Sequence, residues 1–143
     1  MKEGKEKYCG CLYYSANALG RIMTKMAEEA FAPTGLAPSY AFMLMSVNHK
    51  PGIQPMALSD HMQLTPSTVT RLLEKLELKR LVERKSVGRA TEVYPTKKSL
   101  GLQPEIQASW KRLKDNYTAI IGEDMAKRLT ADAFAASQKL DPR

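Results

Sequence analysis

Apolar residues recur at two different spacings along the chain, and the change of spacing separates helical segments from a hairpin. From residue 8 to residue 30, and again from 102 to 120, they follow steps of three and four, the spacing of one helix face. A further amphipathic helix is predicted from about residue 123 to residue 140. Pro104 is expected to kink or restart the second of these helices. Each of these long helices carries an apolar stripe that needs a partner.

Prolines and glycines divide the middle of the chain into shorter elements. After the break APTGLAPS, residues 39–48 are apolar nearly all round, so they are expected to form a helix that is buried on most sides. A second break precedes Pro55, which is well suited to be the first residue of a short helix over residues 55–62.

A β-branched segment replaces the helical spacing after residue 80. Residues 81–95, LVERKSVGRATEVYP, hold Gly88 near their middle, where a turn is needed. This pattern predicts two short strands in a hairpin that ends at Pro95. The resulting order is four helices, a hairpin and two more helices. The predicted fold class is therefore mainly α, with a small β part.

The helix predicted after Thr65 has an unusual polar front. Thr65 is a natural N-cap, and Pro66 suits the first helical position because it has no N–H to lose. Behind them an apolar stripe recurs at helical spacing. The stripe consists of Val69, Leu72, Leu73 and Leu76, and the opposite face carries Ser67, Thr70, Arg71 and Glu74.

Small hydroxyl side chains followed by an arginine are what a helix needs at its N-terminal end to approach base edges in a DNA major groove. The helix dipole also favours phosphate at that end. Taken alone, the same residues could be no more than a good cap on a solvated helix. The short helix before it, joined through Gln63 and Leu64, favours a helix-turn-helix.

Charge and composition support a polyanionic partner. The 143 residues carry 22 Lys and Arg against 15 Asp and Glu, a net charge of +7, and residues 71–98 alone hold nine Lys or Arg against four Glu. Such clustering is typical of a nucleic-acid footprint. No apolar run approaches the roughly 20 residues that span a bilayer, and there are only two cysteines, Cys9 and Cys11. We expect a soluble, cytoplasmic protein of one folded unit.

Three stretches together resemble the MarR family of bacterial transcriptional regulators, which are winged-helix homodimers. They are GLAPSYAFMLM, ALSDHMQLTPSTVTRLLEKLELKRLVER and GRATEVYPTKKS. The resemblance implies that Ser67, Thr68, Thr70 and Arg71 lie in the major groove, and that Arg89 of the wing enters the minor groove. The complete set of candidate DNA-binding residues is Thr65, Pro66, Ser67, Thr68, Thr70, Arg71, Lys75, Arg84, Lys85 and Arg89.

Some positions depart from the family pattern. Arg80 stands where the family usually has glycine, so the turn there must close differently or accept a left-handed non-glycine residue. Val87 stands where an aspartate usually holds the wing arginine, so Arg89 is expected to be less firmly positioned. Pro95 replaces an apolar residue and Ser99 a glycine.

The resemblance also divides the single chain by role. Residues 35–100 would form the winged-helix part, and residues 5–34 and 101–143 the helical dimerisation part. A two-fold homodimer would read a near-palindromic operator in double-stranded DNA, and the protein would act as a repressor released by a small-molecule or oxidative signal. Trp110 and the methionines are most simply core residues, although such residues could line a small-molecule pocket.

The cysteines are a candidate oxidant sensor. The stretch YCGCLYYSANALGR resembles the start of the peroxide-sensing branch of the family, and Cys9 is near the matching place. A sensing thiolate needs a neighbouring donor or positive charge. The simpler interpretation is that Cys9 and Cys11 are small residues near a terminus, and a metal site lacks further ligands at a suitable spacing.

Three other classes of function were compared with DNA binding. No phosphate-binding glycine loop, nucleophile elbow or metal-ligand cluster indicates an enzyme, and no cofactor is expected. A peripheral membrane protein would need an apolar helix face that is exposed to lipid, whereas the Val69 to Leu76 stripe is better explained as part of the domain core. The principal alternative is a winged helix that contacts only proteins, which predicts a neutral or apolar outer face on the recognition helix and wing.

Overall fold

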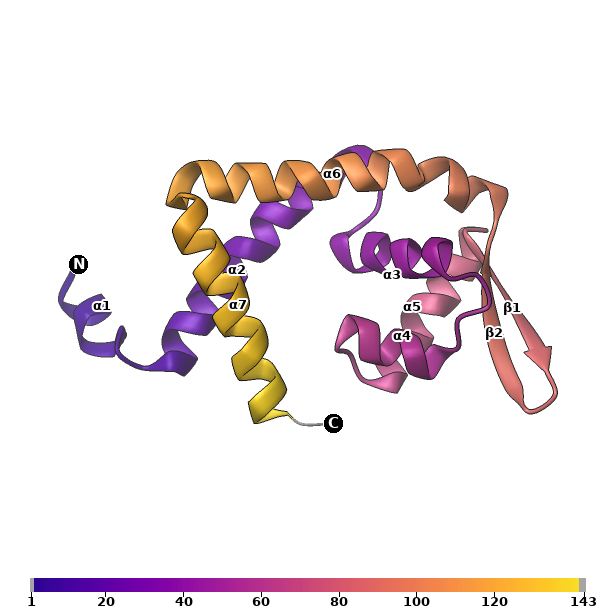
Figure 1. Ribbon diagram of the computed structural model, residues 1–143, viewed down its shortest axis with the longest axis horizontal. Coiled ribbons are helices and arrows are strands. Elements are labelled where there is room, and N and C mark those ends of the chain that lie inside the picture. The colour runs from indigo at the N-terminus through magenta and orange to yellow at the C-terminus, as the bar shows by residue number, and fades with distance from the viewer. Residues whose placement is uncertain (1, 142–143) are drawn as a thin grey trace. The chain divides into compact units, whose positions relative to one another are not determined.

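The computed structural model describes residues 2–141 and contains seven α-helices, one short 3-10 helix and a two-stranded antiparallel sheet within that range (Figure 1). The mainly α prediction with a small β part is confirmed, as is the winged helix-turn-helix. The elements are α1 Lys2–Tyr8, α2 Leu12–Phe31, η1 Ala32–Thr34, α3 Pro38–His49, α4 Pro55–Met62, α5 Pro66–Leu78, β1 Val82–Val87, β2 Ala90–Pro95, α6 Lys97–Ile121 and α7 Glu123–Leu140.

The chain divides into two compact units, of which residues 28–110 form the first. Within this unit α3, α4 and α5 lie together, with the hairpin beside them (Figure 1). The apolar character of α3 has the expected consequence, because four of its side chains are buried. The largest fully buried side chains of the unit are Phe31, Met43, Leu44, Ile53, Leu58, Leu73, Leu76, Leu81 and Ile106.

The hairpin is short, and a two-residue turn joins its strands and fixes their register. Val82 pairs with Pro95 at one end and Val87 with Ala90 at the other. Gly88 has φ 63° at the first turn position, where a type II′ turn requires a positive φ. The loop before α4 adds a single bridge between Ile53 and Val93, which attaches the hairpin to the core.

The second unit combines residues up to 27 with residues from 111 onward. Among its described residues only Ala126 is buried, at 7% exposure. Many large apolar side chains of this unit are exposed, including Leu12, Tyr13, Ile22, Ile120, Leu129, Phe134 and Leu140. None of the helices in residues 2–141 is long and apolar enough to cross a membrane.

Two helix predictions need correction. The helix expected from Tyr8 to Ala30 is interrupted after Tyr8, because Gly10 favours a turn and the Ser15 hydroxyl donates to the Cys9 carbonyl across the break. Of the kink or restart expected at Pro104, the restart is wrong, because α6 continues through this residue, and the kink stays a prediction. Proline removes only one helical hydrogen bond, and the fully buried Ile106 in the next turn holds the helix in place.

The expectation that Trp110 and the methionines are core residues holds only in part. Met43 is fully buried, whereas Met56 on the outer side of α4 is 74% exposed. Trp110 is 45% exposed and meets the edge of Phe42 with ring centroids 5.9 Å apart. An apolar residue type alone does not show which face of a helix it occupies, so composition could not separate these positions.

Candidate nucleic-acid interface

The start of α5 is capped as its sequence predicts. Thr65 is extended, and its side-chain oxygen accepts from the Thr68 backbone N–H at 3.4 Å, with Pro66 in the first helical position. The Thr65 hydroxyl also lies 2.9 Å from that of Thr68 and 3.3 Å from that of Ser67. The hydroxyl cluster at this end of the helix is therefore held together by its own hydrogen bonds.

A tight turn joins α4 to α5. Gln63 adopts a left-handed conformation with φ 53°, and its N–H donates to the Asp60 carbonyl at 3.2 Å. The Leu64 N–H donates to the Ser59 carbonyl at 3.1 Å, and the Ser59 hydroxyl returns a bond to the Leu64 carbonyl. These bonds fix the direction in which α5 leaves α4, which is the requirement of a helix-turn-helix.

The outer face of α5 presents one polar row. Ser67, Arg71 and Lys75 are four residues apart and all exposed, while Val69 and Leu73 on the inner face are buried. The Thr70 hydroxyl is turned back to donate to the Pro66 carbonyl at 3.0 Å. Of the residues predicted on this helix, Ser67, Arg71 and Lys75 therefore form one exposed row.

The basic residues of the wing do not act as one group. Residues next to each other in a strand point to opposite faces, so Arg84 and Lys85 diverge. Arg84 Nη2 donates to Glu77 Oε1 of α5 at 2.8 Å. This hydrogen bond is the main reason that the pKa of Glu77 lies below its ordinary value and the pKa of Arg84 above. Sequence reasoning had assigned Arg84 to DNA and had missed Glu77.

Lys85 lies on the other face of the hairpin. Its Nζ is 4.8 Å from the centre of the Tyr94 ring, and the Tyr94 hydroxyl donates to Glu92 Oε1 at 2.6 Å. The hydrogen bond to Glu92 is the largest cause of a raised pKa for Tyr94. The charge of Lys85 is thus packed on an aromatic ring beside a carboxylate.

Arg89 occupies the tip of the wing, immediately after Gly88, and is exposed. Within residues 2–141 the structure shows no hydrogen bond or ion pair that fixes its side chain. Val87, at the position where the family usually has aspartate, is exposed and apolar, so it cannot supply one. That Arg89 is less firmly positioned than a wing arginine held by an aspartate stays a prediction.

Arg80 adopts the left-handed conformation, with φ 60°. The Leu81 N–H donates to the Leu76 carbonyl at 2.9 Å and the Arg80 N–H to the Glu77 carbonyl at 3.0 Å, which is the Schellman pattern of a helix end. The Arg80 carbonyl accepts from the Thr96 hydroxyl at 2.8 Å. The turn therefore has the geometry that glycine would give, and Arg80 adopts it at the cost of steric strain at its Cβ atom.

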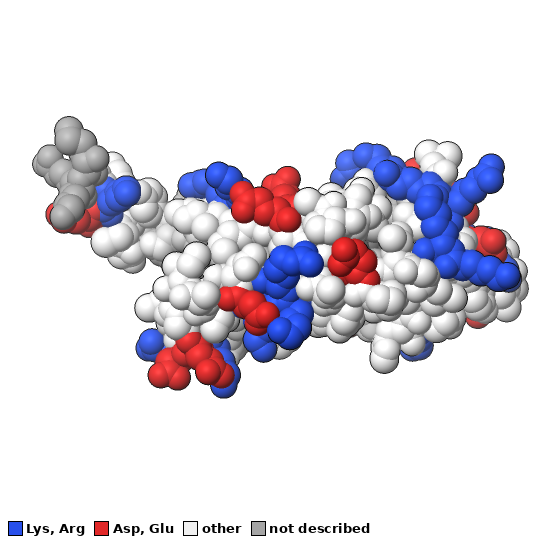
Figure 2. Space-filling model, turned by 90° about the horizontal axis from the view of Figure 1, so that it is seen from above, with Lys and Arg blue, Asp and Glu red and all other residues white. Residues whose placement is uncertain are grey.

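Lysine and arginine gather over the hairpin and the adjacent start of α6, at the right end of Figure 2. Between residues 71 and 98 the exposed cations are Arg71, Lys75, Lys79, Arg80, Lys85, Arg89, Lys97 and Lys98, and the Lys98 side chain reaches the Lys79 carbonyl at 3.2 Å. Lys and Arg outnumber the acidic residues in this segment, nine to four, and such an excess of positive charge favours a sugar-phosphate backbone. A neutral outer face, as expected for a winged helix that contacts only proteins, is not what this surface shows.

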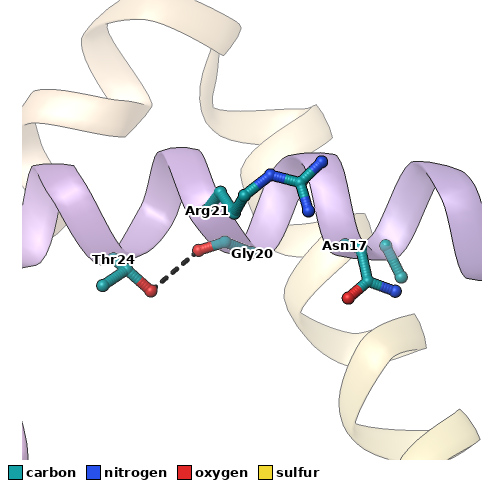
Figure 3. Close-up of a pocket in the computed structure, with 5 residues that line it drawn as sticks. Asn17, Gly20, Arg21 and Thr24 are labelled. Atoms are coloured by element: carbon teal, nitrogen blue, oxygen red, sulfur yellow. Dashed lines mark hydrogen bonds between the residues drawn. The ribbon is translucent and has the colours of Figure 1, made fainter.

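The cysteines and a shallow groove belong to the other unit. Cys9 and Cys11 are free and exposed, and the Cys9 thiol lies 3.5 Å from the Glu6 carbonyl. A groove of about 480 Å³ is lined by α2 alone, through Ala16, Asn17, Gly20, Arg21 and Thr24 (Figure 3). Because one helix lines it, this groove does not enclose a ligand. Among the described residues no cluster of three metal-ligating side chains occurs.

Comparison with known proteins gives a consistent result. Residues 34–90 match the model of the MarR family. The structure of the transcriptional repressor CouR bound to a 23-mer DNA duplex is similar, with 17% identity, a TM-score of 0.82 and coverage of 93% of this chain and 96% of that one. A search of curated protein sequences finds no match.

Two further solved structures are similar over the same length. CouR from Rhodococcus jostii RHA1, bound to p-coumaroyl-CoA, is 20% identical with a TM-score of 0.74, and 92% of each chain is covered. The Mycobacterium tuberculosis regulator MosR in complex with DNA is 19% identical with a TM-score of 0.76, covering 92% of this chain and 98% of that one. These likenesses establish a shared fold.

Proposed function

Because residues 34–90 match the MarR family model and the whole chain shares the fold of its regulators, we propose that this protein is a sequence-specific DNA-binding transcriptional regulator. It acts as a repressor in the cytoplasm, at the nucleoid. The observation that carries the proposal is the exposed row of Ser67, Arg71 and Lys75 on a capped helix whose other face is buried. The tight turn from α4 and the basic hairpin that follows distinguish this helix from an ordinary solvated surface helix.

The N-terminal half of α5 enters the major groove. Arg71 donates to a guanine edge, Ser67 and Thr68 contact bases or phosphates near the positive end of the helix dipole, and Lys75 approaches a phosphate. Arg89 at the wing tip reaches the neighbouring minor groove, where arginine is favoured by the negative potential. Base contacts determine the sequence read, and the remaining cations supply affinity that depends on salt.

The functional unit is a homodimer. The exposed apolar side chains of α2, α6 and α7 are more than a single chain would leave in water, and a second copy covers them. Two-fold symmetry then places two α5 helices about one DNA turn apart, which corresponds to a near-palindromic operator.

A chemical signal releases the repressor from DNA. CouR is known from its structure to bind p-coumaroyl-CoA, and by analogy a small-molecule inducer is proposed here. Oxidation of Cys9 or Cys11 is a second candidate signal, supported by their exposure.

A gel-shift series on the upstream DNA of the protein's own gene tests the proposal. Binding is expected to weaken steeply with salt, since each phosphate contact contributes about 0.9 to the slope of log affinity against log salt. Arg71→Ala is expected to cost about 1–3 kcal/mol and to relax the preference at one base pair.

Arg89→Ala is expected to lower the slope by about one phosphate contact. Arg128→Ala on α7 is the matched control, because it removes an exposed arginine outside the proposed DNA interface, and sedimentation checks that the variant still self-associates. Binding that ignores salt and both interface substitutions would exclude the proposed function and favour the protein-interaction alternative.

A further inference from the structure

The wing carries a charged residue whose side chain is already engaged within the protein. Arg84 Nη2 lies 2.8 Å from Glu77 Oε1, and the two side chains are 31% and 40% exposed. Glu77 lies in the last turn of α5, and Arg84 lies in β1 opposite Val93. The pair therefore joins the helix proposed to read bases to the strand that carries the wing.

We propose that Arg84 is a positioning residue that sets the wing against α5 through Glu77, and that it does not contact phosphate itself. This inference rests on the proposed function and adds to it the means by which the two DNA-reading elements are held in register. It also revises the expectation from sequence that Arg84 binds DNA.

The direction of the side chain supports this role. Arg84 shares its strand face with Val82, which is buried, whereas Lys85 points to the other face and packs on Tyr94. Glu77 is one of three acidic residues in the α5 and β1 segments, and it is the partner to which Arg84 donates. An arginine paired with a carboxylate of its own protein forms a unit without net charge, which attracts phosphate less than a free arginine does.

The need for such a link follows from the connection between the two elements. Only Lys79, Arg80 and Leu81 separate α5 from β1, and Arg80 holds the strained left-handed turn. A two-stranded hairpin is only marginally stable by itself, so its angle to the helix depends on contacts beyond the turn. The ion pair supplies such a contact on the side away from the Ile53 bridge, which holds β2.

The decisive variant is Glu77→Gln, because the two possible roles of Arg84 predict opposite signs. If Arg84 contacted phosphate, removal of the Glu77 charge would free it and DNA binding would strengthen. If Arg84 positions the wing, binding is expected to weaken by about threefold to tenfold, since the pair is partly exposed. Glu74→Gln is the matched control: it removes the same charge one turn earlier without breaking this hydrogen bond, so binding is expected to stay equal or strengthen.

Salt dependence and additivity give two further readouts. Arg84→Ala is expected to weaken binding while leaving the salt slope equal to that of the natural protein, in contrast to Arg89→Ala. The double variant of Glu77→Gln with Arg84→Ala is expected to bind as weakly as the worse single variant, because both remove one interaction. Arg84→Lys, which keeps the charge beside Glu77, is expected to restore part of the affinity.

Amide hydrogen exchange on the free protein makes the test independent of DNA. Glu77→Gln and Arg84→Gln are expected to accelerate exchange in the hairpin, residues 82–95, while α3 keeps its protection and Glu74→Gln changes neither. Absence of salt-dependent DNA binding in the natural protein would overturn the proposed function. The positioning role would then be judged by exchange alone, and equal rates of hairpin exchange in the Glu77→Gln and Glu74→Gln variants would overturn it. With DNA binding intact, tighter binding by Glu77→Gln or a slope lowered by about one in Arg84→Ala would overturn it alone.

Discussion

The two units of this protein bury their apolar residues to very different extents. In residues 28–110 the stripes of α3, α4 and α5 meet each other and the hairpin, and most of their large inward-facing side chains, such as Leu44, Leu58 and Leu73, are fully buried. In the unit made of the terminal segments, Ala126 is the one buried residue among those described, and Phe134 remains 58% exposed. The winged helix is therefore closed within one chain, whereas the terminal helices leave their stripes exposed, and in the proposed homodimer a second copy would cover them.

The largest expected difference between the units is the loss of stability when a buried side chain of residues 28–110 is truncated. Leu44→Ala in α3 removes a fully buried side chain, so the free energy of unfolding is expected to fall by about 2–5 kcal/mol. Met56→Ala on the outer face of α4 removes a mostly exposed side chain and is expected to change it by less than about 0.5 kcal/mol. Urea unfolding followed by circular dichroism measures both, and equal losses would refute the comparison.

The next effect concerns the helices without a partner. Phe134→Ala is expected to weaken self-association by about 1–3 kcal/mol, because the proposed dimer buries an apolar side chain that is exposed in the single protomer. Sedimentation velocity over a dilution series measures the change. Lys139→Ala, on the same helix, serves as the control, and identical monomer fractions for the two variants would argue against these stripes as the interface.

A smaller effect should come from the turn between α5 and β1. Arg80→Gly is expected to raise the free energy of unfolding by about 0.5–1 kcal/mol. The reason is that the steric cost of the left-handed conformation for a residue with a Cβ atom exceeds the extra conformational entropy that glycine loses on folding. Lys79→Gly provides the contrast, because Lys79 has φ −80° and glycine there is expected to destabilise the protein. Thermal unfolding of the two variants should shift in opposite directions; a common direction would remove the strain argument.

The smallest effect is the pH dependence of the Glu77 ion pair. Arg84 lowers the pKa of Glu77 in the folded protein below its ordinary value of 4.5, so the folded state favours the carboxylate. The stability that the pair contributes is then present above that ordinary value and is lost as pH falls through the lowered pKa. For a partly exposed pair it amounts to about 0.2–1 kcal/mol.

Urea unfolding of the natural protein and of Glu77→Gln, at several pH values from about 3 to 6, checks this. The difference between the two is expected to be constant at the upper end and to shrink toward the lower end. A difference that grows as the pH falls would have the wrong sign for this mechanism.

Local sequence determined the elements that depend on neighbouring residues. The α5 cap follows from Thr65 and Pro66, the start of α4 from Pro55, and the hairpin turn from Gly88, because capping and turn preferences act within a few residues. The helix predictions that needed correction rested on the spacing of apolar residues alone. The break at Gly10 and the continuous helix through Pro104 depend on the Ser15 hydroxyl and on the burial of Ile106, which a helical period does not reveal.

Tertiary structure alone decided which charged residues are free. Arg71 and Arg84 look equivalent in the sequence, since both are cations in a basic segment, yet Arg71 is exposed on the α5 row and Arg84 is bonded to Glu77 across a turn. The pairing depends on the angle between a helix and a strand, and that angle is set by the Schellman turn at Arg80 and by the packing of Leu76 and Leu81. Composition and periodicity could locate the basic surface, but only the fold could divide it into residues that face outward and residues that hold the wing.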